Sequence, residues 1–304
     1  MTTLILLALA GFGAQLVDGS LGMGYGVTST TMLLLIGLSP AVASASANFA
    51  QIGTTLASGY SHWRFGNVDW RLVGRLGVPG AVGALLGALF LSRLSTQAAA
   101  PLMGTILAAI GLFILVRYAV RPPAAATARR SPHRRRFLAP LGFAGGFVNA
   151  TGGGGWGPVS TSTLLSAGRT APRTVIGSVS ASEFLVTFSA SMGFLIGLGA
   201  SGIAWAAVAA LLAGGVLAAP VAAWLVTKMP AAVLGVAVGG VIVLLNVRVP
   251  LAVVGVSGTA SLAAHLAIAL TWIGLVAAAA YRVRTTRAEA ARETTPATSG
   301  TLVA

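Results

Sequence analysis

The sequence contains no cysteine and only five acidic residues among its 304 positions. The absence of cysteine excludes disulfide bonds and thiol chemistry. Charged residues make up 8% of the chain and hydrophobic residues 56%, whereas a soluble domain carries roughly 25% charged residues. This composition excludes an ordinary soluble domain. It predicts an all-α polytopic membrane protein whose helices satisfy their own backbone polar groups within lipid.

Few side chains are available for catalysis or metal binding. No pair of histidines or carboxylates has metal-ligand spacing, and the sequence offers no convincing Ser-His-Asp set. We therefore expect no metal, no cofactor and no enzymatic activity. The net charge is +14, but the basic residues cluster in loops and in the C-terminal tail. That pattern indicates contact with the lipid bilayer rather than with nucleic acid.

Two glycine clusters interrupt otherwise apolar segments. They are Asp18-Gly-Ser-Leu-Gly-Met-Gly-Tyr-Gly26 and Asn149-Ala-Thr-Gly-Gly-Gly-Gly-Trp-Gly157. A glycine costs a helix interior about 1 kcal/mol relative to alanine, so each cluster predicts a helix break. Non-helical backbone survives in a membrane only where protein buries it or where it lines a cavity. Paired breaks are typical of a transporter's binding site; the alternative is that the glycines serve only close helix crossing.

The second half of the sequence repeats the first. Adding 131 to the residue number pairs Gly11-Phe12 with Gly142-Phe143, Val17 with Val148, Asp18 with Asn149, Ser20 with Thr151, Gly22, Gly24 and Gly26 with Gly153, Gly155 and Gly157, and Ser29-Thr30 with Ser160-Thr161. Adding 132 pairs Pro40, Ser46, Gln51 and Thr55 with Pro172, Ser178, Glu183 and Thr187. A shift of one residue is small for a duplicated unit, so we infer an internal repeat.

The repeat defines the expected organisation of the chain. We expect a first repeat at 1–120, a basic cytoplasmic linker at 121–136, a second, inverted repeat at 137–249, one additional transmembrane helix at 250–281, and a disordered cytoplasmic tail at 282–304.

The positions of lysine and arginine decide between two topologies. If both broken segments cross the membrane, eleven basic residues lie on the linker side and eight lie opposite. If both are re-entrant hairpins, only Arg93 and Arg248 of the 19 basic residues lie opposite the linker. The positive-inside rule favours the second arrangement. Each repeat is then one glycine-rich hairpin plus three transmembrane helices, and three crossings invert the second repeat. The N-terminus is expected outside and the C-terminus in the cytoplasm.

The two glycine clusters suit an anion site built without positive side chains. A helix N-terminus presents free N–H groups and a positive dipole end, and neither cluster contains lysine or arginine. We expect the two tips to face each other near the membrane midplane. The candidate substrate-binding residues are Asp18, Gly22, Gly24, Asn48, Gln51, Asn149, Thr151, Gly153, Gly155 and Ser180. Asp18 can either cap the helix that follows it or titrate, and Asn149 can only cap.

Glu183 is the only acidic residue inside an unbroken predicted span. An intramembrane carboxylate is a functional candidate by default, so Glu183 is the candidate for proton coupling. Its repeat mate Gln51 cannot ionise. The alternative role for Glu183 is a structural hydrogen bond between helices.

Three motifs resemble the sulfite exporter TauE/SafE family over about residues 5–247. They are Val17-Asp-Gly-Ser-Leu-Gly-Met-Gly-Tyr-Gly26, Ser61-His-Trp-Arg-Phe-Gly-Asn-Val-Asp69 and Asn149-Ala-Thr-Gly-Gly-Gly-Gly-Trp-Gly-Pro158. The resemblance implies a multi-pass permease of the bacterial inner membrane for sulfite, organosulfonates or related sulfur anions. Members of the family often carry His and Glu where this chain has Asn48 and Gln51, which leaves Glu183 as the remaining acid.

The leading hypothesis is a secondary transporter, most consistent with an exporter, that moves a small inorganic or organic sulfur anion by alternating access. The alternative is an anion channel of the same architecture, and steady single-channel steps in a planar bilayer would identify it. A non-transporting scaffold has no need of broken helices. The sequence is compatible with a homo-oligomer as well as with a monomer.

Overall fold

The computed structural model describes residues 2–21, 23–120, 132–167, 169–228 and 231–294, and all regular structure within these ranges is helical. The all-α class is thus confirmed. Five helical stretches among the described residues are long and apolar enough to cross a membrane: 70–93, 96–120, 172–198, 232–253 and 258–285. The chain is therefore a multi-pass membrane protein. The apolar stretches 2–18 and 205–218 are shorter.

The first repeat forms a broken helical pair followed by three long helices. These are α1 (Thr2–Leu21), α2 (Tyr25–Leu35), α3 (Pro40–Arg64), α4 (Trp70–Arg93) and α5 (Thr96–Val120). Proline at the first position begins α3. The Asp69 side chain caps α4 by accepting hydrogen bonds from the N–H groups of Arg71 and Leu72.

The second repeat follows the same order. It comprises α6 (Arg135–Thr151), a π-helical turn η1 (Gly157–Thr161) that runs into α7 (Ser162–Ser166), α8 (Pro172–Leu198), a 3-10 turn η2 (Ala200–Gly202), α9 (Trp205–Lys228), α10 (Ala231–Asn246) and the short α11 (Arg248–Val253). The last helix, α12 (Gly258–Thr294), continues well past the expected end of the additional span at 281. Most of the predicted linker and residues 295–304 of the predicted tail lie outside the described residues.

The two broken helices have unequal arms. α1 has 20 residues and α2 has 11, and α6 has 17 residues against a total of ten in η1 and α7. At 1.5 Å per residue, the first arms are about 25–30 Å long, which is close to the thickness of the hydrocarbon core. Each break therefore lies closer to the second end of its broken helical pair than to the first.

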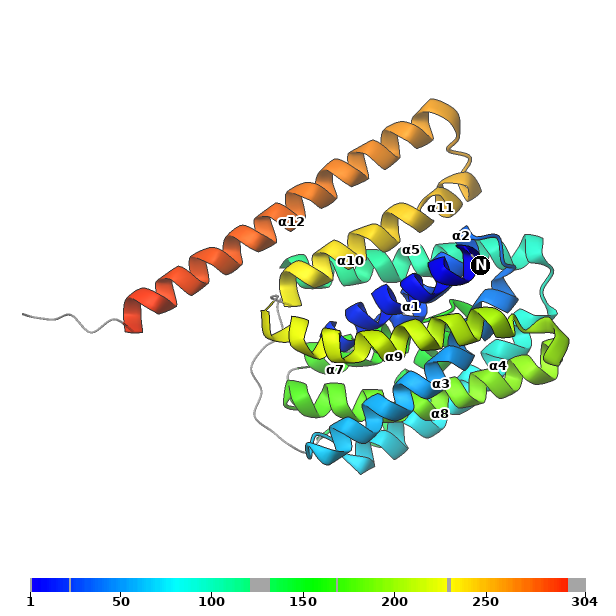
Figure 1. Ribbon diagram of the computed structural model, residues 1–304, viewed down its shortest axis with the longest axis horizontal. Helices are drawn as coiled ribbons and strands as arrows, with labels where there is room; N and C mark the ends of the chain where they lie inside the picture. The colour runs from blue at the N-terminus through cyan, green and yellow to red at the C-terminus, as the bar shows by residue number, and fades with distance from the viewer. Residues whose placement is uncertain (1, 22, 121–131, 168, 229–230, 295–304) are drawn as a thin grey trace, which may run out of the picture.

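The two repeats exchange helices. The closest helix pairs include α1 with α9 and α4 with α6, so the first helix of each broken pair packs on a long helix of the other repeat. Figure 1 shows α9 running alongside α1 in the middle of the bundle, with α3, α4 and α8 below. The remaining large contacts between repeats are α3 and α4 with α8, and α5 with α10. Neither repeat forms a separate core.

Glycines make these exchanged interfaces close. A side-chain carbon placed on Gly83 or Gly146 would overlap the backbone of the partner helix in the α4–α6 pair. The same holds for Gly11 and Gly214 in the α1–α9 pair. Small residues that let backbones approach are the usual packing device in membranes.

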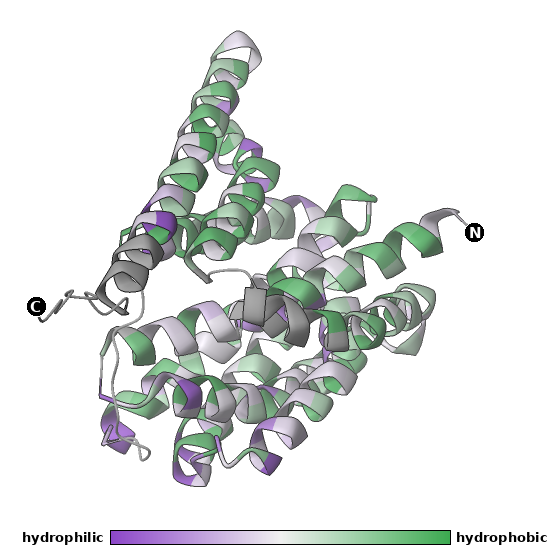
Figure 2. Cartoon of the chain, turned by 60° about the vertical axis from the view of Figure 1, so that its left-hand side comes forward, coloured by the Kyte–Doolittle hydropathy of each residue, from purple (hydrophilic) through white to green (hydrophobic). Residues whose placement is uncertain are grey.

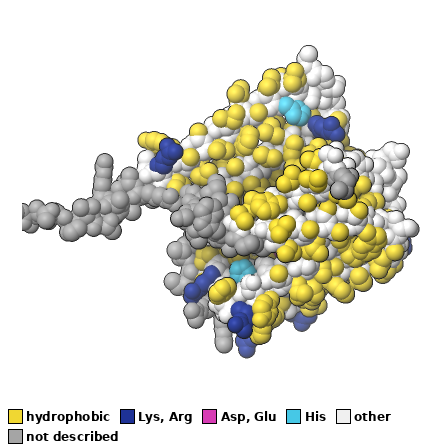
Figure 3. Space-filling view, in the orientation of Figure 1, with side chains coloured by type: hydrophobic (Ala, Val, Ile, Leu, Met, Phe, Trp, Pro, Cys, Tyr) yellow, Lys and Arg dark blue, Asp and Glu magenta, His cyan; other side chains and the backbone are white. Residues whose placement is uncertain are grey.

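α3 differs from the apolar helices because its polar side chains turn inward. Ser44, Ser46, Asn48, Gln51, Thr54 and Thr55 are all buried. The outer surface is apolar by comparison. Figure 2 shows hydrophobic residues along most helices and the hydrophilic colour mainly near helix ends. Figure 3 shows a face covered largely by hydrophobic side chains, with a few Lys and Arg groups near its margins.

Candidate functional site

The two breaks have matching backbone geometry. Gly24 and Gly155 are repeat mates with φ angles of 123° and 153°, values that L side chains rarely adopt. A side-chain carbon on either glycine would lie 2.9 Å from the Cγ1 atom of the equivalent valine, Val17 or Val148. Glycine is therefore required at both positions by conformation and by space.

Each break is also closed by an equivalent hydrogen bond. The Asp18 carboxylate accepts from the backbone N–H of Tyr25 at 3.4 Å, and the Asn149 side-chain carbonyl accepts from the N–H of Trp156 at 3.2 Å. Both acceptors precede their donors by seven residues. The bonds satisfy a free N–H where the second helix begins. Capping is thus the contact that Asp18 makes in this structure.

The two tips touch each other directly. A side-chain carbon on Gly26 would lie 2.8 Å from the Cα atom of Gly154. The hydroxyl of Thr30 in α2 donates to the carbonyl oxygen of Gly153. The tips therefore pack backbone against backbone at this point, which leaves no space for an anion directly between Gly26 and Gly154.

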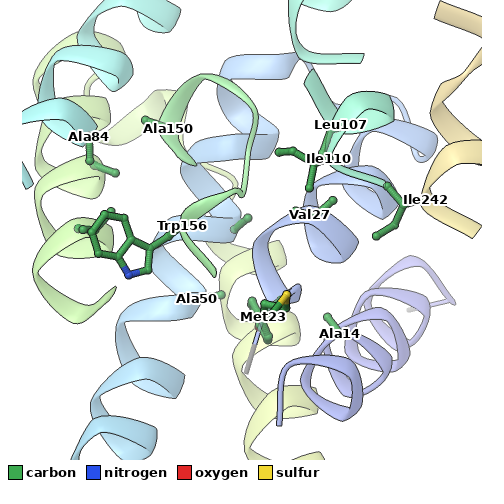
Figure 4. Close-up of a cluster of buried hydrophobic side chains, with 14 of the residues drawn as sticks. Ala14, Met23, Val27, Ala50, Ala84, Leu107, Ile110, Ala150, Trp156 and Ile242 are labelled. Carbon is green, nitrogen blue, oxygen red and sulfur yellow. The ribbon is translucent and has the colours of Figure 1, made fainter. Parts of the chain in front are cut away.

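The aromatic residue that follows each break anchors it to the other repeat. The Tyr25 hydroxyl donates to the carbonyl oxygen of Leu211 in α9 at 3.1 Å. Trp156 is fully buried and lies against Gly80 of α4, where a side-chain carbon would approach the indole to 2.5 Å. Figure 4 shows the Trp156 ring beside Ala84 of α4, with Met23 and Val27 of the first break elsewhere in the same cluster.

The inward face of α3 joins the second tip to the first repeat. The Asn149 side-chain amide donates to Oδ1 of Asn48 at 3.0 Å, and the Ser44 hydroxyl donates to the carbonyl oxygen of Ala150 at 2.6 Å. The Asn48 amide donates in turn to the Ser44 carbonyl oxygen. Because Asn149 also holds Trp156, one buried amide links the break to α3.

Gln51 and Glu183 contact each other although they are 132 residues apart. The Gln51 amide donates to Oε1 of Glu183 at 3.2 Å, and both side chains are at least 93% buried. Oε1 of Gln51 has no hydrogen-bond partner among the described residues and lies beside Gly26. The hydrogen bond between repeat mates places this pair between the two halves.

The predicted site residues fall into two groups. The structure places Gly24, Asn48, Gln51, Asn149, Gly153, Gly155, Asp18 and Glu183 at or beside the breaks. Ser180 lies apart from them and shares a 2.8 Å hydrogen bond with Ser58. Thr151 donates to the carbonyl of Phe147 within its own helix. Gly22 lies outside the described residues.

Sequence reasoning missed three residues at the tips. Thr30 bonds the opposite break, and Tyr25 and Trp156 anchor the breaks. Thr30 lies in a matched Ser-Thr pair of the repeat, and Tyr25 and Trp156 are aromatic mates. Those matches are the signals from which these residues could have been found.

Buried neutral donors around paired helix breaks, inside a bundle of apolar helices, define a membrane transporter. The family model for the sulfite exporter TauE/SafE matches residues 7–249, and the chain belongs to this family. It is 50% identical over 248 residues to the probable membrane transporter protein YtnM of Bacillus subtilis strain 168, covering 82% of this chain and 83% of that protein. No solved structure matches the chain. Both matches indicate a transporter rather than an enzyme.

Proposed function

We propose that this protein is a secondary carrier that exports small sulfur-containing anions, such as sulfite or organosulfonates, across the bacterial inner membrane. Membership of the sulfite exporter family supports the substrate class. The observation that carries the mechanism is the direct contact of two equivalent helix breaks from opposite repeats. Neutral N–H and O–H donors bind an anion by dipoles and hydrogen bonds alone.

The packing supports two inverted repeats with re-entrant hairpins. The turn between α2 and α3, the start of α5 and α11 line one cavity, so they share one end of the bundle. At the other end, Arg282 of α12 donates to the carbonyl of Ala119 near the end of α5, and Asn67 packs on Gly177 near the start of α8. In Figure 1 the start of α1 and the far end of α12 lie on opposite sides.

A contact between repeat mates supports a pseudo-two-fold axis, because Gln51 bonds Glu183. In a two-fold arrangement, a residue can touch its own equivalent only near the axis. Hairpins that enter from opposite faces, each with an arm longer than half the membrane, must overlap. Overlap accounts for tips that pack side by side.

The anion site is therefore proposed beside the tip contact. Asn48 and Asn149 lie there, and each side-chain amide carries two N–H groups that can donate to an anion. Rocking of one repeat against the other around this point would expose the anion to each side in turn. Glu183, which sits between the repeats, is proposed to carry the coupled proton.

The function is tested with purified protein in proteoliposomes. Efflux of sulfite, sulfonate, thiosulfate and sulfate is measured with and without a pH gradient. We expect saturable transport of at least one of these sulfur anions, and accumulation against its gradient when protons supply the energy. Steady single-channel current steps in a planar bilayer would show that the protein is an anion channel and not a carrier.

Topology is tested independently. We expect an external N-terminus, a cytoplasmic linker and a cytoplasmic tail. Because the chain is free of cysteine, single cysteines at Thr2, Thr127 and Thr295 can be probed in intact cells with an impermeant thiol reagent. Only the cysteine at Thr2 should react. Labelling of the cysteine at Thr295 from outside would overturn the seven-span arrangement.

A further inference from the structure

A cavity of about 290 Å³ opens at the end of the bundle that carries Arg248. The turn between α2 and α3, the start of α5, the end of α10 and the start of α11 enclose it. Its polar lining comes from Thr31, Ser39, Thr96, Asn246 and Arg248, and the rest is mainly leucine, valine and small residues. We call this space the Arg248 cavity. None of the residues predicted as the binding site lines it.

The charge of the Arg248 cavity has one sign. Arg248 is the only charged residue in its lining, and the lining contains no aspartate or glutamate. The five acids of the chain lie elsewhere: Asp18, Asp69 and Glu183 belong to the tip, to the α3–α4 loop and to α8, and Glu289 and Glu293 belong to the C-terminal part of α12. A solvent-accessible cavity with a single uncompensated guanidinium attracts an anion and repels a cation.

The floor of the Arg248 cavity offers a directed donor. The Asn246 amide donates to the Thr31 hydroxyl oxygen at 3.1 Å and to the carbonyl oxygen of Ile242. The Thr31 hydroxyl accepts this bond and donates to no partner among the described residues, so its proton is available to a ligand. Thr31 is 98% buried and follows Thr30, which bonds the opposite tip. The cavity thus ends one residue from the tip contact.

We propose that the Arg248 cavity is the external binding site for a small aliphatic sulfonate, which rests on the transport function proposed above. The single guanidinium matches one negative charge, the Thr31 hydroxyl supplies a neutral donor, and the leucine and valine side chains accept a short alkyl group. Sulfate and the sulfite dianion carry two charges and no apolar group. The cavity therefore favours an alkyl sulfonate over either. Its volume lies at the small end of ligand pockets.

The test uses a reporter cysteine that leaves the polar lining intact. Ala100 lines the cavity, so Ala100→Cys introduces a unique thiol there. Right-side-out vesicles are treated with an anionic sulfonatoethyl or a cationic trimethylammonium-ethyl methanethiosulfonate, and the ratio of the two labelling rates is measured. Ethanesulfonate and sulfate are compared as protecting ligands. Arg93→Gln is the matched control, because Arg93 is the other basic residue expected at this end and does not line the cavity.

We expect the anionic reagent to react preferentially, Arg248→Gln to lower the anionic-to-cationic ratio several-fold, and Arg93→Gln to leave it unchanged. Ethanesulfonate should protect the thiol at lower concentration than sulfate, and Thr31→Val should weaken that protection. An unchanged ratio in Arg248→Gln, equal protection by sulfate, or labelling only from the opposite face would overturn the proposal. Labelling reads binding without transport, so this result is separate from the proteoliposome assay: sulfonate protection in a protein that moves no sulfur anion would count against the carrier alone.

Discussion

The two halves of this protein carry the same pair of functional groups in reversed positions. The first repeat has an acid at its tip, Asp18, and an amide in the following long helix, Gln51. The second repeat has the amide at its tip, Asn149, and the acid in the long helix, Glu183. The tips make equivalent capping bonds, 3.4 Å from Tyr25 and 3.2 Å from Trp156. A cap requires only an acceptor oxygen, so this comparison teaches that charge is dispensable for the tip geometry.

The largest effect on transport is expected at the two tip glycines, where the halves are most alike. Gly24→Val and Gly155→Val each place a branched side chain at a positive φ, at a strain of roughly 1–3 kcal/mol, and against a valine. Each variant should insert into the membrane and lose at least about tenfold of transport, as each 1.4 kcal/mol corresponds to a factor of about ten. The loss is measured as the flux into proteoliposomes, normalised to the amount of reconstituted protein.

Gly74→Val is the matched control, because no atom lies within 4 Å of the added carbon. If one tip variant transports normally while the other is inactive, the two breaks do not work as a pair. Normal transport by both would reduce the glycines to a packing role.

The next largest effect is expected at Glu183, the ionisable member of the Gln51–Glu183 pair, and it should concern proton-driven accumulation. Glu183→Gln keeps a hydrogen-bonding side chain beside Gln51 but removes the exchangeable charge. We expect it to bind substrate and exchange anion for anion, while losing accumulation driven by a pH gradient. Paired uptake measurements, with and without the gradient, check this. Undiminished gradient-driven uptake would exclude Glu183 as the proton carrier.

The aromatic anchors should give a smaller, graded effect. Tyr25→Phe removes the bond to Leu211, and Trp156→Phe removes the 3.1 Å indole bond to Val179. Each lost bond is worth about 1 kcal/mol, and the Trp156 change also leaves space beside Gly80. The midpoint temperature of thermal unfolding in detergent should therefore fall further for Trp156→Phe than for Tyr25→Phe. Equal stability of both variants and the wild type would show that the anchors do not hold the tips.

The smallest effect is expected at the first tip. Asp18→Asn gives it the residue that the second tip already has, with its acceptor oxygen retained. Transport and stability should stay close to wild type, whereas Asp18→Ala loses the acceptor and about 1 kcal/mol. The same flux and unfolding measurements serve here. Loss of gradient-driven transport in Asp18→Asn would assign the coupled proton to the tip.

Local chemistry made the helical class and both helix breaks predictable from the sequence. Glycines at 24 and 155 and acceptors at 18 and 149 act within a few residues of the break that they shape. The packing of α1 and α6 on helices of the other repeat could not be predicted from local sequence, because it depends on which of several equally apolar helix faces meet. Ser180 illustrates this limit. Its repeat mate Asn48 bonds the second tip, yet Ser180 bonds Ser58.

The last helix shows a different limit. Apolarity declines after Tyr281, and the sequence therefore predicted the end of the span there. α12 continues to Thr294, since Arg, Ala and Glu are strong helix formers and a helix outside the bilayer needs no apolar face. Hydropathy marks where a helix leaves the membrane, whereas backbone propensity marks where the helix ends.

The exchanged packing of α1 on α9 and of α6 on α4 also constrains how the protein is made. When the ribosome has completed the first repeat, the glycine faces of α1 and α4 have no partner, because α9 and α6 are not yet synthesised. The first repeat must therefore remain in the lipid, with its helix break not yet covered by the second repeat, until translation continues. Assembly is completed only as the second repeat inserts between helices already in place, and the order of translation becomes part of the route to the native bundle.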